Sequence, residues 1–351
     1  MTYPGLNMVA RVVWSPDGTR FLTTDDNGVR TWDATTGETT QTLTTNWTRS
    51  AVWSPDGTRI LTAGRGGVHM WDATTGETTQ TLTTDTDWTN SAAWSPDGTR
   101  ILTTGLLGVH MWDTATGRTT QTLTTNSTFS AAWSPDGTRI LTTDDNGVHM
   151  WDATTGETTQ TLTTNRTNSA AWSPDGTRIL TTDDNGVHMW DATTGETTQT
   201  LTTNRTNSAA WSPDGTRILT TGPHGVHMWD ATTGRTTQTL TTNSTFSAAW
   251  SPDGTRILTT DDNGVRTWDA TTGETTQTLT TDTDWTNSAA WSPDGTRILT
   301  TGLLGVHMWD ATTGETTQTL TTDTDWTNSA AWSPDGTRIL TTGLLGVHMW
   351  D

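Results

Sequence analysis

Histidine is the residue type whose spacing in this sequence is most suggestive of chemistry. It recurs at one position of a repeated unit, at His69, His110, His149, His188, His227, His307 and His348. Imidazole binds metals and transfers protons near neutral pH. If the units are stacked sheets, neighbours lie about 10 Å apart, whereas zinc needs nitrogen ligands at about 2.0–2.1 Å. We therefore interpret these histidines as packing between neighbouring sheets, the blades of such a stack, and predict no metal site.

The other candidate reactive groups are weaker. Asp85 and Asp87, or Asp144 and Asp145, are spaced as in calcium loops, but the distal glutamate of such loops is missing. Calcium in the loops remains an alternative. The sequence has no phosphate-binding loop, nucleophile elbow or zinc-protease motif. Any acid or base in the repeat would also occur nine times at equivalent positions, so we predict neither an enzyme nor a cofactor.

The charge and residue composition of the chain indicate which classes of partner it can bind. The 351 residues carry a net charge of −20 and no cysteine, and all 18 basic residues are arginine. Such a field repels phosphate backbones and anionic lipid headgroups, so we expect neither nucleic-acid nor membrane partners. The sequence lacks a signal peptide and an apolar run long enough to span a bilayer. We expect a soluble, cytoplasmic monomer.

An internal repeat of 39 to 41 residues accounts for nearly the whole chain. In each copy a tryptophan precedes the string SPDGTR, and a second tryptophan, followed by aspartate, lies 18 residues later. Alternating β-branched residues predict four short strands, which in one copy are residues 130–133, 138–143, 147–151 and 158–162. SPDG suits a tight turn, with proline second and glycine fourth. We predict one domain, residues 1–351, with the repeated tryptophans in its core.

The strings WSPDGTRILTT and GVHMWDATTGE resemble the WD40 repeat, and the near-identity of the copies resembles recently amplified bacterial, designed or consensus propellers. The resemblance implies an all-β, WD40-type β-propeller of nine four-stranded antiparallel blades. It also implies a ring closed by the N-terminal strand, which completes the last blade. A smaller ring, with units left over or exchanged between chains, is the alternative.

Two family features are altered here. The Gly-His pair before the first strand is missing, and the aspartate six residues before the second tryptophan is kept only at Asp26, Asp145, Asp184 and Asp262. We therefore expect that the Asp-His-Ser/Thr-Trp network of the family does not form in its usual shape.

The copies differ mainly in two connections, one before the first strand and one between the second and third strands. In a four-stranded meander these connections leave the same face, so we predict one variable face that binds a partner. Trp-containing DTDWTN segments always accompany a Leu-Leu pair in the same copy. The predicted contact residues are Trp47, Trp88, Leu106, Leu107, Phe129, Arg166, Arg205, Phe246, Trp285, Leu303, Leu304, Trp326, Leu344 and Leu345.

Three functional hypotheses remain open at this point. The first is a non-enzymatic interaction or scaffold module that binds a protein or peptide through the variable loops. The second is a multivalent, lectin-like glycan binder, in which loop aromatics stack on sugars. The third is a scaffold without a ligand. The Trp and Leu side chains also have a purely local explanation, since they can cover one another as a small cluster.

Overall fold

A four-stranded antiparallel sheet is the building unit of the chain. The computed structural model describes residues 2–3, 11–25, 28–43, 48–82, 89–105, 108–123, 128, 130–162, 167, 169–183, 186–201, 206, 208–223, 225–240, 245–261, 264–279, 286–302, 305–320, 327–343 and 346–351. These residues contain nine such sheets, numbered here in chain order. No helix long and apolar enough to cross a membrane occurs among them.

Each sheet begins with a strand that ends at the first repeated tryptophan and continues with a strand that opens on the SPDGTR arginine or the isoleucine after it. The first strands are β2 (Arg11–Trp14), β6 (Thr48–Trp53), β10 (Thr89–Trp94), β14 (Ser130–Trp133), β18 (Ser169–Trp172), β22 (Ser208–Trp211), β26 (Thr245–Trp250), β30 (Thr286–Trp291) and β34 (Thr327–Trp332). The second strands are β3 (Arg20–Asp25), β7 (Arg59–Gly64), β11 (Arg100–Gly105), β15 (Arg139–Asp144), β19 (Arg178–Asp183), β23 (Arg217–Gly222), β27 (Arg256–Asp261), β31 (Arg297–Gly302) and β35 (Ile339–Gly343).

The third strand carries the second repeated tryptophan, and the fourth is the Thr- and Gln-rich strand. The third strands are β4 (Gly28–Asp33), β8 (Gly67–Asp72), β12 (Gly108–Asp113), β16 (Gly147–Asp152), β20 (Gly186–Asp191), β24 (Gly225–Asp230), β28 (Gly264–Asp269), β32 (Gly305–Asp310) and β36 (Gly346–Trp350). The fourth strands are β5 (Thr39–Leu43), β9 (Thr78–Leu82), β13 (Thr119–Leu123), β17 (Thr158–Leu162), β21 (Thr197–Leu201), β25 (Thr236–Leu240), β29 (Thr275–Leu279) and β33 (Thr316–Leu320). The ninth sheet has the order β1-β36-β35-β34, with β1 (Thr2–Tyr3) from the N-terminus, as predicted.

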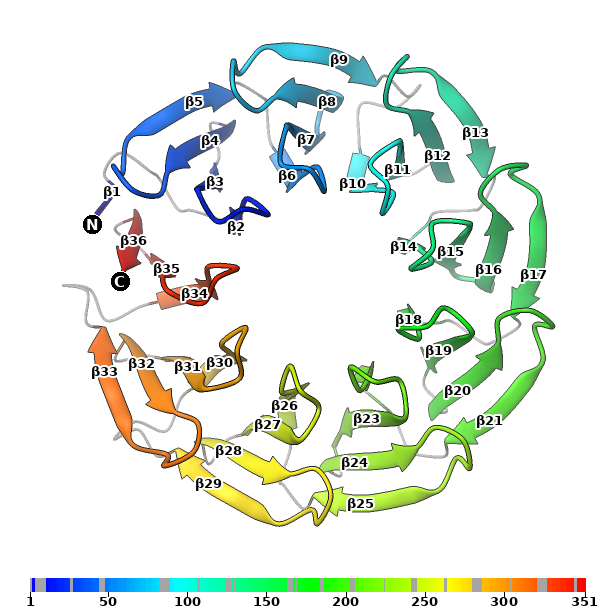
Figure 1. Cartoon of the computed structure of the whole chain (residues 1–351). Helices are drawn as coiled ribbons and strands as arrows, with labels where there is room; N and C mark the ends of the chain where they lie inside the picture. The colour runs from blue at the N-terminus through cyan, green and yellow to red at the C-terminus, as the bar shows by residue number, and fades with distance from the viewer. Residues whose placement is uncertain are drawn as a thin grey trace. The chain divides into compact units, whose positions relative to one another are not determined.

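The chain divides into two compact units, residues 3–170 and residues 171–351, with Thr2 grouped with the second. In the first unit, successive sheets follow a curve with their first strands inside and their fourth strands outside (Figure 1). In the second unit the sheets have the same arrangement (Figure 1). The single domain inferred from the repeat stays a prediction.

The core lies between neighbouring sheets of a unit. Leu22 and Val29 of sheet 1 pack with Trp53, Ile60 and Trp71 of sheet 2. The second repeated tryptophan is also bonded inside its own sheet, because its indole N–H donates to a threonine hydroxyl of the second strand. In sheet 2, for example, the distance between Trp71 Nε1 and Thr62 Oγ1 is 2.9 Å. The structural role predicted for the tryptophans is confirmed for the buried ones.

An arginine clamp adds a polar link between neighbouring sheets. Arg217 of sheet 6 lies over the Trp250 ring of sheet 7, with its guanidinium carbon 5.0 Å from the ring centroid. Its Nη1 donates to the Ala270 carbonyl at 2.8 Å, and its Nη2 donates to the Gly254 carbonyl at 2.7 Å. Both carbonyls belong to sheet 7, so one side chain joins two sheets by charge-assisted hydrogen bonds and by its contact with an aromatic face.

Candidate interaction surface

The variable connections leave from one end of each sheet. In sheet 3, Thr89 is paired with Gly105 across the first two strands. Thr89 directly follows the DTDWTN tryptophan, and Gly105 directly precedes the Leu-Leu pair. Thr286 and Gly302 of sheet 8, and Thr327 and Gly343 of sheet 9, form the same pair. Both variable connections of a copy are therefore anchored side by side.

The repeated turns lie at the opposite end of the sheet. In sheet 2 the Ser54 amide donates to the Arg59 carbonyl at 2.8 Å, and the Gly57 amide donates to the Ser54 carbonyl, which closes the tight turn. Gly57 has a φ of 69°, a conformation that favours glycine. The Ala73 amide of the second repeated turn donates to the Thr58 carbonyl of the first, at 2.9 Å. The two repeated turns therefore pack together.

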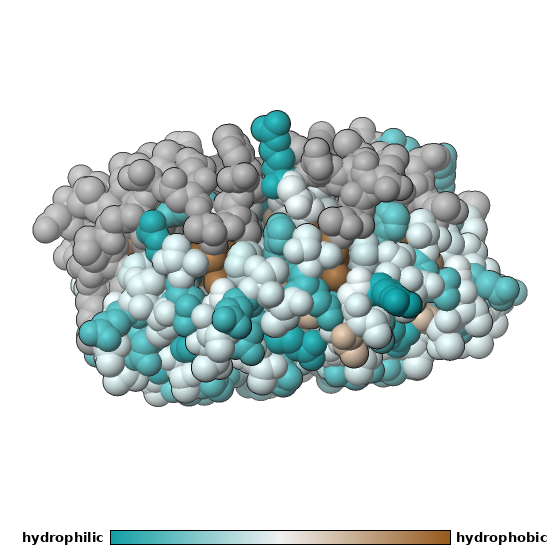
Figure 2. All heavy atoms as spheres, turned by 90° about the horizontal axis from the view of Figure 1, so that it is seen from above, coloured by the Kyte–Doolittle hydropathy of each residue, from teal (hydrophilic) through white to brown (hydrophobic). Residues whose placement is uncertain are grey.

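Carboxylates at this repeated end are engaged by their own turns. Asp56 accepts hydrogen bonds from the Ser54 hydroxyl at 2.5 Å and from the Thr58 amide at 3.0 Å. The Ser54 hydroxyl is the main cause that lowers the pKa of Asp56 to about 2. Backbone amides of Thr75 and Thr74 likewise lower the pKa of Asp72. These carboxylates stabilise the turns. On the side of the molecule drawn in Figure 2, the described residues are mostly neutral to hydrophilic in hydropathy.

Nearly all of the predicted contact residues lie outside the described residues. Phe246 is the exception, because its backbone lies in strand β26. The others are Trp47, Trp88, Leu106, Leu107, Phe129, Arg166, Arg205, Trp285, Leu303, Leu304, Trp326, Leu344 and Leu345. Their role in binding stays a prediction, supported so far by the paired residues that flank them.

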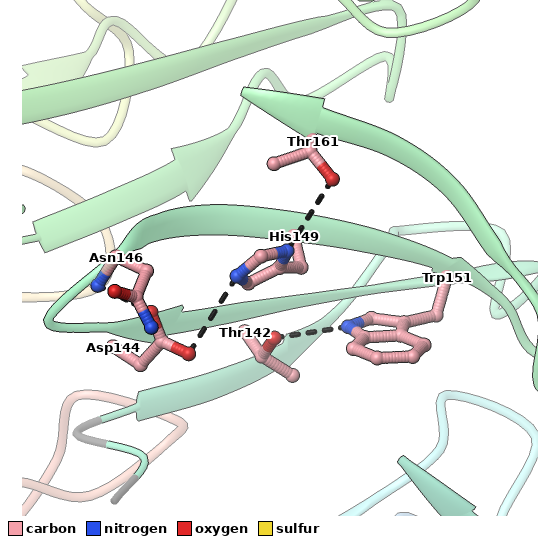
Figure 3. Close-up of polar contacts among 6 residues, drawn as sticks. All are labelled: Thr142, Asp144, Asn146, His149, Trp151 and Thr161. Atoms are coloured by element: carbon pink, nitrogen blue, oxygen red, sulfur yellow. Dashed lines mark hydrogen bonds and ion pairs between the residues drawn. The ribbon is translucent and has the colours of Figure 1, made fainter. Parts of the chain in front are cut away.

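A polar network that the sequence analysis did not predict lies beside the second variable connection. In sheet 4, Asp144 ends the second strand and its side chain is buried, with Oδ2 3.6 Å from His149 Nε2 (Figure 3). The Asp144 Oδ1 accepts the Asn146 amide at 2.7 Å. The other ring nitrogen of His149 lies 3.5 Å from the Thr161 hydroxyl of the fourth strand.

This network differs in shape from the family network. The aspartate that contacts the histidine is Asp144, whereas Asp145, the family-type position, is exposed. The histidine contacts shown by Figure 3 lie within one sheet, and the packing of these histidines between blades stays a prediction. The same figure shows Trp151 bonded to Thr142 at 2.9 Å, so the Trp-Thr half of the family network does form. The missed signal is an aspartate followed five residues later by a histidine or an arginine.

That spacing recurs in three further sheets. Asp183 Oδ2 lies 3.5 Å from His188 Nε2, and Asp261 Oδ2 lies 2.7 Å from Arg266 Nη1. Asp25 pairs with Arg30 at 3.4 Å. In the other five sheets glycine ends the second strand. Burial of the His69 ring, in one of these glycine sheets, lowers the pKa of that histidine. The described residues contain no cluster of three potential metal ligands.

Comparison with protein-family models identifies the family to which the chain belongs. The family model "Eukaryotic translation initiation factor eIF2A" matches residues 4–110 and 183–278, which is more than half of the chain. The model "WD domain, G-beta repeat" matches residues 117–152, 156–191, 273–310 and 314–351. The chain belongs to the eIF2A family and is built of WD40 repeats. A search of curated proteins found no match.

Solved structures agree with this WD40 fold. The "Crystal Structure Of The C-Terminal WD40 Domain Of Sif2" is similar with a TM-score of 0.65 at 17% identity, over 87% of this chain and 96% of that one. The "Crystal structure of the eukaryotic initiation factor" is similar with a TM-score of 0.72 at 15% identity, over 92% and 90%. At these identities the similarity concerns the fold. The predicted WD40-type propeller, with nine four-stranded blades among the described residues, is confirmed.

Proposed function

We propose that this WD40 chain is a non-enzymatic, cytoplasmic interaction module that binds a protein or peptide through the variable ends of its sheets. One observation carries the proposal: in sheets 3, 8 and 9 the two variable connections are flanked by residues that pair at one end of the sheet, as Thr89 does with Gly105. Variation is therefore concentrated where neighbouring connections can form a joint surface. Residues common to all copies are sufficiently explained by the blade itself.

The repeated end is the less suitable binding surface. Its carboxylates already accept hydrogen bonds from their own turns, as Asp72 does from the Thr74 and Thr75 amides at 2.9 and 2.8 Å. A partner that recruited these groups would have to replace those bonds at a cost. Tryptophan and leucine at the variable end are, by contrast, residue types that bury apolar area on binding.

The test is affinity capture of partners from a cell lysate with two variants. In the first, Trp88, Trp285 and Trp326 are changed to alanine at the variable end. In the matched control, Arg118→Glu and Arg235→Glu restore the residue that the other copies carry in the same repeated turn. Because the family description names a translation initiation factor, the translation machinery is the first class of partner to look for.

We expect the tryptophan variant to lose capture at least tenfold, as for removal of interface hot spots worth about 1.4 kcal/mol or more. The arginine control is expected to capture the same partners as the natural chain. Equal capture by all three proteins, or loss only in the control, would refute the proposal.

A further inference from the structure

The third strands of seven sheets carry a methionine at the same register position, and these methionines differ in exposure. Each is paired with a leucine of the second strand, as Met308 is with Leu299 in sheet 8. Met308 is 8% exposed and Met349 is 5% exposed, whereas the other five are 1% exposed. Those five are Met70, Met111, Met150, Met189 and Met228. Met308 is therefore the methionine of this set that a small solute reaches most easily.

The packing around the thioether accounts for this difference. Met111 of sheet 3 belongs to a core cluster with Trp151 and Ala153 of sheet 4, which are 6% and 1% exposed. The cluster that contains Met308 has Trp350 of sheet 9 at its edge, and this tryptophan is only half-buried. The contact between sheets 8 and 9 therefore covers its methionine less completely than the contact between sheets 3 and 4 does.

The Met308 thioether also lies beside a guanidinium group. Arg297 Nη1 is 3.8 Å from the Met308 sulfur. The same side chain reaches sheet 9, where its guanidinium carbon lies 4.8 Å from the centroid of the Trp332 ring and its Nη2 donates to the Gly336 carbonyl. In sheet 6 the Nη1 of Arg217 donates to a carbonyl at 2.8 Å. A thioether is only a weak hydrogen-bond acceptor, so Arg297 Nη1 could bind a better acceptor at this place.

Two other sheets show that the methionine position accepts an oxygen atom when a hydrogen-bonding group is close. Thr31 in sheet 1 and Thr267 in sheet 7 replace the methionine, and both are 0% exposed. Their hydroxyl groups lie 2.6 Å from the Thr40 hydroxyl and 2.7 Å from the Thr276 hydroxyl. A buried oxygen at this position is thus compatible with the fold, provided that it has a hydrogen-bond partner.

We propose that Met308 is a site of oxidation by peroxide and that Arg297 binds the sulfoxide that forms. The sulfur attacks one oxygen of hydrogen peroxide, so that an S–O bond forms as the O–O bond breaks. The proton of the transferred hydroxyl passes to the leaving hydroxide, which becomes water. Sulfur loses two electrons and peroxide gains them. Enzymes that reduce methionine sulfoxide reverse this step. Oxidation replaces a weak sulfur contact by a charge-assisted hydrogen bond from Arg297 Nη1 to the sulfoxide oxygen.

Limited treatment with hydrogen peroxide, followed by mass spectrometry of peptides cleaved after arginine, tests the site. Met308 lies in the peptide 298–338, Met349 in 339–351, Met111 in 101–118 and Met228 in 218–235. Fragment spectra assign each added oxygen to its residue. We expect Met308 to be oxidised about eightfold faster than Met111 and Met228, in proportion to exposed fractions of 8% and 1%, with Met349 between them. A rate for Met308 no greater than the rates for Met111 and Met228 would overturn the proposal.

The shift in urea midpoint caused by oxidation tests the role of Arg297. Compared at equal oxidation of Met308, Arg297→Ala should show a larger shift than the natural chain, because the sulfoxide oxygen then lacks its donor. Arg217→Ala, the equivalent change in sheet 6, should leave the shift unchanged. Met308→Thr, which copies the residue of sheets 1 and 7, should abolish it. Equal shifts in Arg297→Ala and the natural chain would overturn the assignment of Arg297, and a shift that persists in Met308→Thr would overturn that of Met308.

Discussion

Loss of one arginine clamp between sheets should destabilise the chain measurably. Arg217→Ala removes two hydrogen bonds to carbonyls of the next sheet, at 2.8 and 2.7 Å, and a guanidinium contact with Trp250. Hydrogen bonds to charged groups contribute about 1.5–3 kcal/mol each when buried, and a cation–π contact about 0.5–2 kcal/mol. Because this arginine is half-buried, water replaces part of the loss. We therefore expect a decrease of about 2–3 kcal/mol in the free energy of unfolding.

Urea unfolding followed by tryptophan fluorescence measures this decrease. Arg235→Ala is the matched control, because Arg235 lies in the same sheet but is exposed, and surface substitutions of that kind usually change stability by less than about 0.5 kcal/mol. Arg217→Lys should recover only part of the loss, since an ammonium cannot reach both carbonyls in the geometry of the guanidinium. An Arg217→Ala midpoint equal to that of the control would refute the clamp as a stabilising contact.

Three further predictions follow from the turns and the core. Gly156→Ala should lower the free energy of unfolding, measured in urea, by up to about 1 kcal/mol more than Gly137→Ala. Both glycines have positive φ, but the new Cβ at Gly156 would lie 2.5 Å from Gln121 Oε1, so that this side chain must move and give up its hydrogen bond to the Thr154 carbonyl, whereas the Cβ at Gly137 would lie 3.4 Å from Pro96 Cδ. Equal losses would contradict this. Thr142→Val leaves the buried Trp151 N–H without its acceptor and should lower the free energy of unfolding by about 1–3 kcal/mol. A urea midpoint equal to that of the natural chain would contradict this prediction. The lowered pKa values of Asp56, Asp294 and Asp335, each to about 2, imply stability that is present above about pH 4 and lost as pH falls toward 2. Circular dichroism during acid titration checks this, and Asp294→Asn should reduce the loss; an unchanged acid titration in that variant would argue against it.

The strands and turns of this protein were predictable because their signals are local and repeated. Residues 158–162 were predicted as a strand and form β17, and the SPDG turn closes through the expected bond from the Gly57 amide to the Ser54 carbonyl. Completion of the ninth sheet by β1 was also predictable, because eight copies show which strand the last copy lacks.

Contacts that depend on the registry of side chains were not predictable in the same way. The Arg217 clamp needs the spacing between two sheets, which no local pattern encodes. Asp144 and Asp145 are adjacent and chemically identical, and only the pairing of Asp144 with Gly147 across the hairpin decides which of them is buried. The predicted contact residues of the variable connections remain predictions, because all of them except Phe246 lie outside the described residues.

Hydrogen-exchange footprinting of the chain bound to a captured partner tests the central claim most directly. Peptides from the variable connections and peptides from the repeated turns can be followed in one experiment. We predict that the partner slows exchange in segments such as 83–89 and 280–286 and leaves turns such as 54–58 unchanged. Slowed exchange in the repeated turns with no change in the variable connections would contradict the assignment of the binding surface.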